Sequence, residues 1–113
     1  MKTRTILTND SVIETKSEDL AKSLGTNLWV TDNPDHLVDA LNRSKHSRLA
    51  IDLDCAGSRF DEICKTLSVM SSRCDLTLFG EGGSLALHQN SFLSYERLTT
   101  EQFANQLLDW LAY

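Results

Sequence analysis

The chain has 113 residues, a formal net charge of -5 at pH 7, 41% hydrophobic residues and 24% charged residues. These values predict one globular domain, residues 1–113, with a single hydrophobic core. The negative charge argues against direct binding of nucleic acid, because gripping phosphates needs a basic face. The sequence contains no apolar run of about 18 residues and no apolar segment behind its basic start. We therefore expect no membrane span, no signal peptide and a cytoplasmic location.

The three cysteines, Cys55, Cys64 and Cys74, are odd in number and contain no CxxC pair. They predict reduced thiols rather than a disulfide framework or a zinc site. The three histidines are scattered at no metal-ligand spacing, so we expect them on the surface or in turns.

The first half of the chain predicts two units of a strand followed by a helix. Residues 3–8 (TRTILT) are typical of a strand, because β-branched residues dominate them. The helix that follows begins either near Val12 or near Ser17, since residues 15–18 (TKSE) fit a capping box. Gly25 suits the left-handed position after its end. Residues 28–30 form the second strand, and Asn33-Pro34 opens the next helix as N-cap and first helical residue.

The second half predicts three further strands and helices. A third strand spans 48–53 (RLAIDL), and Ser58 caps a helix whose apolar residues recur at helical spacing. A fourth strand covers 76–79, a short helix 84–89 and a fifth strand 92–95. Residues 99–102 (TTEQ) form a capping box for the last helix. Its apolar face consists of Phe103, Leu107, Trp110 and Leu111, and we expect this face to dock on the sheet.

Alternating strands and helices with short connections predict an α/β fold with a parallel sheet covered on both faces. The simplest solution is a five-stranded, doubly wound, flavodoxin-like (βα)5 sheet with strand order 2-1-3-4-5. Strands one and three are neighbours in that order. Their carboxyl ends would place Asn9 and Asp10 beside Asp52 and Asp54.

Carboxylates gathered a few ångströms apart repel one another by about 3 kcal/mol per pair at an effective dielectric near 20. Mg²⁺ suits such a group, because it binds one or two carboxylates and keeps several waters. One interpretation is therefore a metal-assisted, phosphoryl-accepting site with Asp10, Asp52 and Asp54 as metal ligands. The other is that these acids end loops and cap backbone amides, which acids at loop ends commonly do.

At these residues the chain resembles the receiver domains of bacterial two-component response regulators. Residues 6–10 (ILTND) are similar to the family's first strand and acidic pair, and residues 49–53 (LAIDL) to its phospho-acceptor strand. Gly57 and the pair at 62–63 (EI) fall in step with the loop and helix that follow. The resemblance implies that Asp52 is the phospho-acceptor of a phosphorelay.

The resemblance also assigns the neighbouring residues. Asp10 would be a Mg²⁺ ligand, Asn9 the altered partner in the acidic pair, and Asp54 a ligand through its backbone carbonyl. A receiver phosphorylates itself by positioning the aspartate against a phosphodonor and Mg²⁺.

The chain departs from the family at the residues that respond to phosphorylation in receiver domains. Gly80 falls on or near the position of the family's serine or threonine hydroxyl, and Tyr95-Glu96-Arg97 replaces its lysine and proline. Arg97 could substitute for the lysine only if the register shifted by two residues. These changes favour a degenerate receiver, or pseudo-receiver. Such a module would have no enzyme activity and would regulate by binding a protein partner or by forming a homodimer. It could also be the N-terminal domain of a transcriptional regulator.

Three alternatives stay open. The first is an atypical but active receiver that uses Asp52 with Mg²⁺. The second is a small flavodoxin-like protein that binds a nucleotide or FMN, although the segment after the first strand has no phosphate-cradling loop and the glycines at 80–83 fit a permissive turn. The third is a module similar to anti-sigma-factor antagonists, in which Ser58 would be the modified residue.

Overall fold

The computed structural model describes residues 3–43, 48–69, 75–80 and 95–112. At its centre is a five-stranded sheet in the order β2-β1-β3-β4-β5, in which every neighbouring pair is parallel. The strands are β1 (Arg4–Leu7), β2 (Leu28–Thr31), β3 (Arg48–Asp52), β4 (Asp75–Phe79) and β5 (Glu96–Leu98). This order confirms the predicted flavodoxin-like α/β fold and makes β1 and β3 neighbours.

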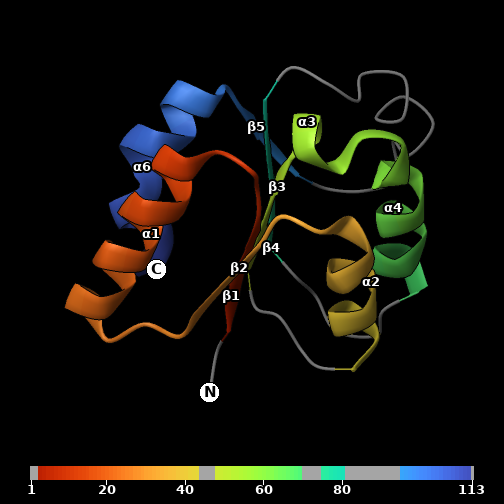
Figure 1. Ribbon diagram of the computed structural model, residues 1–113, viewed down its shortest axis with the longest axis horizontal. Helices are drawn as coiled ribbons and strands as arrows, with labels where there is room; N and C mark the ends of the chain where they lie inside the picture. The colour runs from red at the N-terminus through yellow and green to blue at the C-terminus, as the bar shows by residue number, and fades with distance from the viewer. Residues whose placement is uncertain (1–2, 44–47, 70–74, 81–94, 113) are drawn as a thin grey trace.

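Helices cover both faces of the sheet, as right-handed crossovers between parallel strands require. Figure 1 views the sheet edge-on, with α1 (Ser11–Leu24) and α6 (Thr100–Ala112) on the left. On the right lie α2 (Pro34–Arg43), the short α3 (Leu53–Ala56) and α4 (Phe60–Val69), the last preceded by a 3₁₀ turn at Gly57–Arg59. Within the described ranges, no helix is long and apolar enough to cross a bilayer.

The alternation of side chains along each strand divides the core into two clusters, one on each face of the sheet. Leu7 and Ile51 belong to the cluster under α2 and α4, and Ile6 and Ala50 to the cluster under α1 and α6. In the second cluster the predicted face of α6 is buried, as expected. Phe103 stacks on Phe79 of β4, with ring centroids 4.4 Å apart.

The structure confirms most of the predicted helix ends. The Asn33 side chain accepts a hydrogen bond from the Asp35 amide at 2.9 Å, and Thr99 and Gln102 exchange side-chain-to-amide bonds as a capping box. Gly25 ends α1 with φ of +67°. Of the two predicted starts of the first helix, the one near Val12 is confirmed, because α1 begins at Ser11 with Asp10 as its N-cap; the capping box at 15–18 is wrong.

The third helix differs from the prediction. A turn of helix, α3, follows β3 at once and is capped by Asp52, and Ser58 lies inside the 3₁₀ turn rather than capping α4. The buried carboxylate of Asp52 accepts a hydrogen bond from an amide immediately after its own strand, so the helical conformation starts about six residues earlier than a cap at Ser58 predicts. The predicted periodicity of α4 is confirmed at Phe60, Ile63 and Cys64, which are buried.

The fifth strand also lies later in the chain than predicted. It comprises Glu96–Leu98 and pairs with Thr77–Phe79 of β4, whereas Tyr95 precedes the strand. The predicted residues 92–94 and the predicted helix at 84–89 lie outside the described residues. Strand propensity favours the apolar residues at 92–95. The position of β5 is instead decided by the packing of Leu98 against the cluster under α6 and by the register with β4.

Candidate functional site

The site is built where β1 and β3 end side by side. Leu7 pairs with Ile51 in the sheet, so the next residues, Thr8 and Asp52, meet at the carboxyl edge. The Thr8 hydroxyl donates a hydrogen bond to Oδ2 of Asp52 at 2.9 Å. Both side chains are buried, with Thr8 0% and Asp52 4% exposed. The sequence predicted this meeting of strand ends, but not the threonine that makes the contact.

Asp52 uses its second oxygen as well. Oδ1 accepts a hydrogen bond from the Asp54 amide at 3.0 Å, which makes Asp52 the N-cap of α3. Burial raises the pKa of the Asp52 carboxyl above its usual value. The Thr8 hydroxyl and the amides of Asp54 and Cys55 oppose that rise, and the nearby charge of Asp54 adds to it. Both oxygens of this carboxylate are therefore held by groups of the protein.

Asp10 has a structural role in the same network. Its Oδ1 accepts hydrogen bonds from the amides of Val12 and Ile13, at 2.9 and 3.2 Å, and thereby caps α1. The Asp10 amide in turn donates to the Thr8 hydroxyl at 3.0 Å. The Thr8 hydroxyl thus accepts a hydrogen bond from the Asp10 amide, before α1, and donates one to Asp52, at the end of β3. One side chain therefore connects the two strand ends that the sequence predicts to be neighbours.

Gly80, which follows β4, lies close to the carboxylates of Asp52 and Asp54, at the end of β3. A Cβ atom at this position would lie 2.9 Å from Oδ2 of Asp54 and 3.0 Å from Oδ1 of Asp52. The backbone φ of +93° also disfavours any residue with a side chain. Arg97 of β5 donates from Nη2 to the Gly80 carbonyl oxygen at 2.8 Å, so in this structure it holds the loop backbone. The positive φ and the two neighbouring carboxylates therefore both favour glycine at this position.

The predicted metal ligands are brought to the same edge of the sheet, but Asp10 and Asp52 act there as helix caps. Within residues 3–43, 48–69, 75–80 and 95–112, no group of three or more His, Cys, Asp or Glu side chains is placed to hold a metal ion. Asn9, the predicted altered member of the acidic pair, is exposed. The Mg²⁺ role of Asp10, Asp52 and Asp54 stays a prediction, and a metal would have to compete with the amides and the hydroxyl already bound.

The thiol nearest to this network is Cys55, whose Sγ contacts the Asp32 carbonyl oxygen at 3.3 Å. Burial, with the charges of Asp52 and Asp32, raises the pKa of Cys55 to about 11. Burial also raises the pKa of Cys64 to about 11. Both thiols are free and stay protonated at neutral pH, so neither is an activated nucleophile. Cys74 lies outside the described residues.

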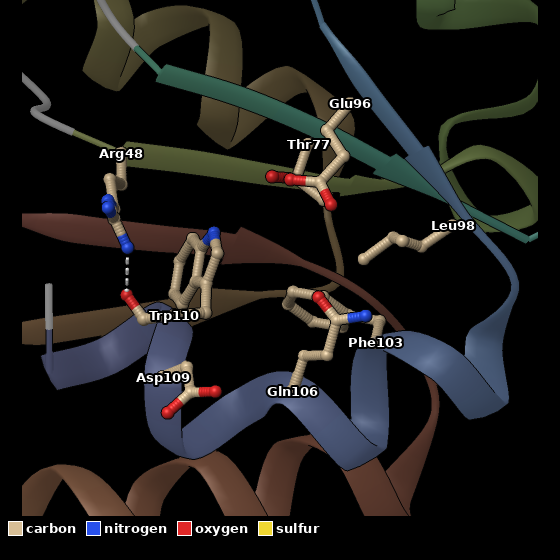
Figure 2. Close-up of a pocket in the computed structure, with 8 residues that line it drawn as sticks. All are labelled: Arg48, Thr77, Glu96, Leu98, Phe103, Gln106, Asp109 and Trp110. Atoms are coloured by element: carbon tan, nitrogen blue, oxygen red, sulfur yellow. Dashed lines mark hydrogen bonds between the residues drawn. The ribbon is translucent and has the colours of Figure 1, made fainter.

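A separate hollow of about 240 Å³ lies between the sheet and α6 and contains none of the predicted site residues. Figure 2 shows Arg48 at one end of it, donating to the Trp110 carbonyl oxygen at 2.6 Å. Thr77 and Glu96 lie opposite each other on β4 and β5 and form its wall. Its walls mix acids, an amide and aromatic rings. No pattern in the sequence predicts this hollow, because it depends on how far α6 lies from the edge strand.

Comparison with models of known protein families finds no family that matches the chain, and comparison with curated proteins finds no match. The interpretation of the site therefore depends on its own geometry.

The first prediction concerns Gly80. The substitution Gly80→Ala should lower the free energy of unfolding by about 2–3 kcal/mol, because it adds a crowded Cβ to a positive φ. Gly25→Ala is the matched control, since Gly25 also has a positive φ but nothing within 4 Å of the added atom. That control should cost only about 1 kcal/mol. Urea denaturation measures both, and equal losses would contradict the close contact with the carboxylates.

The second prediction concerns the pH dependence of stability. Because the pKa of Asp52 is raised in the folded state, the folded protein binds its proton more tightly than the unfolded chain. The contribution of this group to stability is therefore largest below 3.8, its ordinary pKa, and is lost as pH rises through the folded-state value. The stability of Asp52→Asn relative to the unsubstituted protein should increase from acid to neutral pH. A difference that stays constant, or decreases, would refute the raised pKa.

Proposed function

We propose that this protein is a regulatory module that acts by binding protein, with the scaffold of a receiver domain but without phosphoryl transfer at Asp52. The observation that carries the proposal is the condition of Asp52. Its side chain is 4% exposed, and both carboxylate oxygens accept hydrogen bonds from Thr8 and from the start of α3. A nucleophile must present an accessible oxygen lone pair to its phosphodonor. Here both oxygens stabilise the junction of β1, β3 and α3 instead.

The surroundings of Asp52 support the same proposal. Gly80 falls on or near the position where the resemblance to receivers expects a hydroxyl, and an added Cβ there would crowd the two carboxylates. Arg97, the cation closest in sequence to the expected lysine, has its guanidinium on the Gly80 carbonyl oxygen. Neutralising a developing acyl phosphate requires a cation aimed at the phosphate. In this geometry the Arg97 guanidinium stabilises the backbone at Gly80 instead.

The remaining features favour a role in binding rather than catalysis. Thr8 and Asp10 form a network that rigidifies the carboxyl edge of the sheet, and the thiol of Cys55 beside it is protonated at neutral pH. A fixed edge of this kind presents a constant surface. We therefore infer that regulation depends on which protein surface the domain contacts, and that the partner is another protein or a second copy of this chain.

An active receiver is the second candidate. The convergence of Asp52 and Asp54 beside Gly80, at the carboxyl ends of β3 and β4, favours it, because ligands of doubly wound sheets bind at this edge. For this candidate, a divalent cation would have to displace the Thr8 hydroxyl or the α3 amides from Asp52, and Mg²⁺ would offset the repulsion between the two carboxylates.

The third prediction separates these two candidates. Incubation of the full chain with acetyl phosphate and Mg²⁺, or with beryllofluoride and Mg²⁺, should leave the intact mass and the fold unchanged. Mass spectrometry under mild conditions measures the first, and amide NMR spectra measure the second. The variant Asp52→Asn is the matched control, because it removes the acceptor oxygen. A stoichiometric adduct in the unsubstituted protein that is missing from the control would establish the active receiver and overturn the proposal.

A further inference from the structure

The two edges of the sheet are protected to very different degrees. β5 is three residues long, and two of them, Glu96 and Arg97, are charged and exposed. Charged side chains on an edge strand discourage another strand from pairing with it. β2, at the other edge, consists of Leu28–Thr31 (LWVT) and contains no charge and no proline. Its register with β1 is continuous over all four residues, without a bulge. Of the two edges, β2 is the one open to pairing.

The outer side of β2 presents a defined set of backbone groups. The carbonyl oxygens of Asn27 and Thr31 accept hydrogen bonds from Arg4 and Thr8, so these odd-numbered residues point their backbone groups toward β1. Along a strand the backbone groups of successive residues point to alternate sides. Leu28 and Val30 therefore direct their N–H and C=O groups away from the sheet. Another strand can bond to these two residues without disturbing the pairing with β1.

A hollow of about 470 Å³ lies along this edge, beneath the second half of α1. Glu18 and Lys22 line it from the helix, and Leu28 and Val30 line it from the strand. Both charged side chains are exposed, and neither forms an ion pair with any residue in the described part of the chain. They are four residues apart, so they follow each other along one side of the helix.

We propose that β2 is the interface of a homodimer, in which the β2 strands of two copies pair antiparallel and join the two sheets into one. The two-fold axis passes through Trp29, perpendicular to the sheet. Leu28 of one copy then exchanges both backbone hydrogen bonds with Val30 of the other, and the symmetric pair does the same. Trp29 lies opposite its own copy. The pairs formed by residues 28–30 on both faces of the new junction are apolar or aromatic, and a polar pair of Thr31 with Asn27 follows at each end.

The charges on α1 make a second copy the best-fitting partner. α1 runs antiparallel to β2, so Glu18 lies toward the Val30 end of the strand and Lys22 toward the Leu28 end. Their separation of about 6 Å along the helix axis matches the two-residue rise from Leu28 to Val30 in a strand. The two-fold rotation places the Val30 end of one β2 strand beside the Leu28 end of the other. Glu18 of each copy therefore faces Lys22 of the other, which gives two ion pairs per dimer and selects the antiparallel register.

This inference deepens the proposed function by naming the partner, and it depends on that proposal only for its regulatory meaning. The interface lies on β2 and α1, whereas the proposal on phosphoryl transfer concerns Asp52 at the end of β3. A monomeric protein would overturn the dimer and leave the chemistry of Asp52 unaffected. An adduct on Asp52 would overturn the proposed function and leave the dimer standing.

The fourth prediction tests the interface by charge exchange. Sedimentation velocity over micromolar to millimolar concentrations should show a reversible monomer–dimer equilibrium for the full chain. Glu18→Lys should raise the dimer dissociation constant by about tenfold or more, because it turns two attractive pairs into repulsive ones. Combining it with Lys22→Glu restores complementary pairs, and the dissociation constant should return to within about twofold of its starting value.

Asp109→Lys is the matched control, because it makes the same change in net charge at an exposed position of α6, at the hollow beside β4 and β5. It should leave the dissociation constant unchanged. Val30→Pro is the second test: it removes an outward N–H and spares every hydrogen bond to β1, a position where edge strands accept proline. It should abolish the dimer. A protein that is monomeric throughout, a double charge exchange that fails to restore the dimer, or a dimer that survives Val30→Pro would overturn the inference.

Discussion

The hydrogen bond from the Thr8 hydroxyl to the Asp52 carboxylate connects the neighbouring strands β1 and β3 at the carboxyl edge of the sheet. This is the edge at which doubly wound sheets bind their ligands. Thr8 also accepts the amide of Asp10, the cap of α1, while Asp52 caps α3. Two helices and two strands therefore depend on one hydroxyl and one buried carboxylate. Each group offsets the cost of burying the other, because an unpaired carboxylate in this position would lose its hydration without compensation.

The architecture was predictable because it follows from local patterns that agree with one another. Strand-like segments alternate with helical periodicity, and short connections permit only a parallel sheet with right-handed crossovers. The caps at Asn33 and Thr99 and the left-handed Gly25 were readable because each depends on a few adjacent residues. The same reasoning placed Asp10, Asp52 and Asp54 at one edge of the sheet.

What the sequence did not predict depends on contacts between distant residues. Nothing near Thr8 in the chain indicates that it bonds to a residue 44 positions later. β5 was placed too early because the pairing with β4 and the packing of Leu98 outweigh strand propensity. Asp52 begins a helical turn because its own carboxylate caps the following amides, and this moved the start of the third helical segment. Asp10 and Asp52, two of the acids whose spacing suggests a metal site, are helix caps in three dimensions.

The central claim is that the Asp52 carboxylate is buried and that the Thr8 hydroxyl supports its charge. Carbon-13 NMR of the side-chain carboxyl, recorded against pH in the unsubstituted protein and in Thr8→Val, tests it most directly. Asp52 should titrate above 3.8, and its pKa should rise further in Thr8→Val, because that variant loses a donor to the charged form. A carboxyl that titrates at or below 3.8, or whose pKa does not respond to the loss of the hydroxyl, would contradict it.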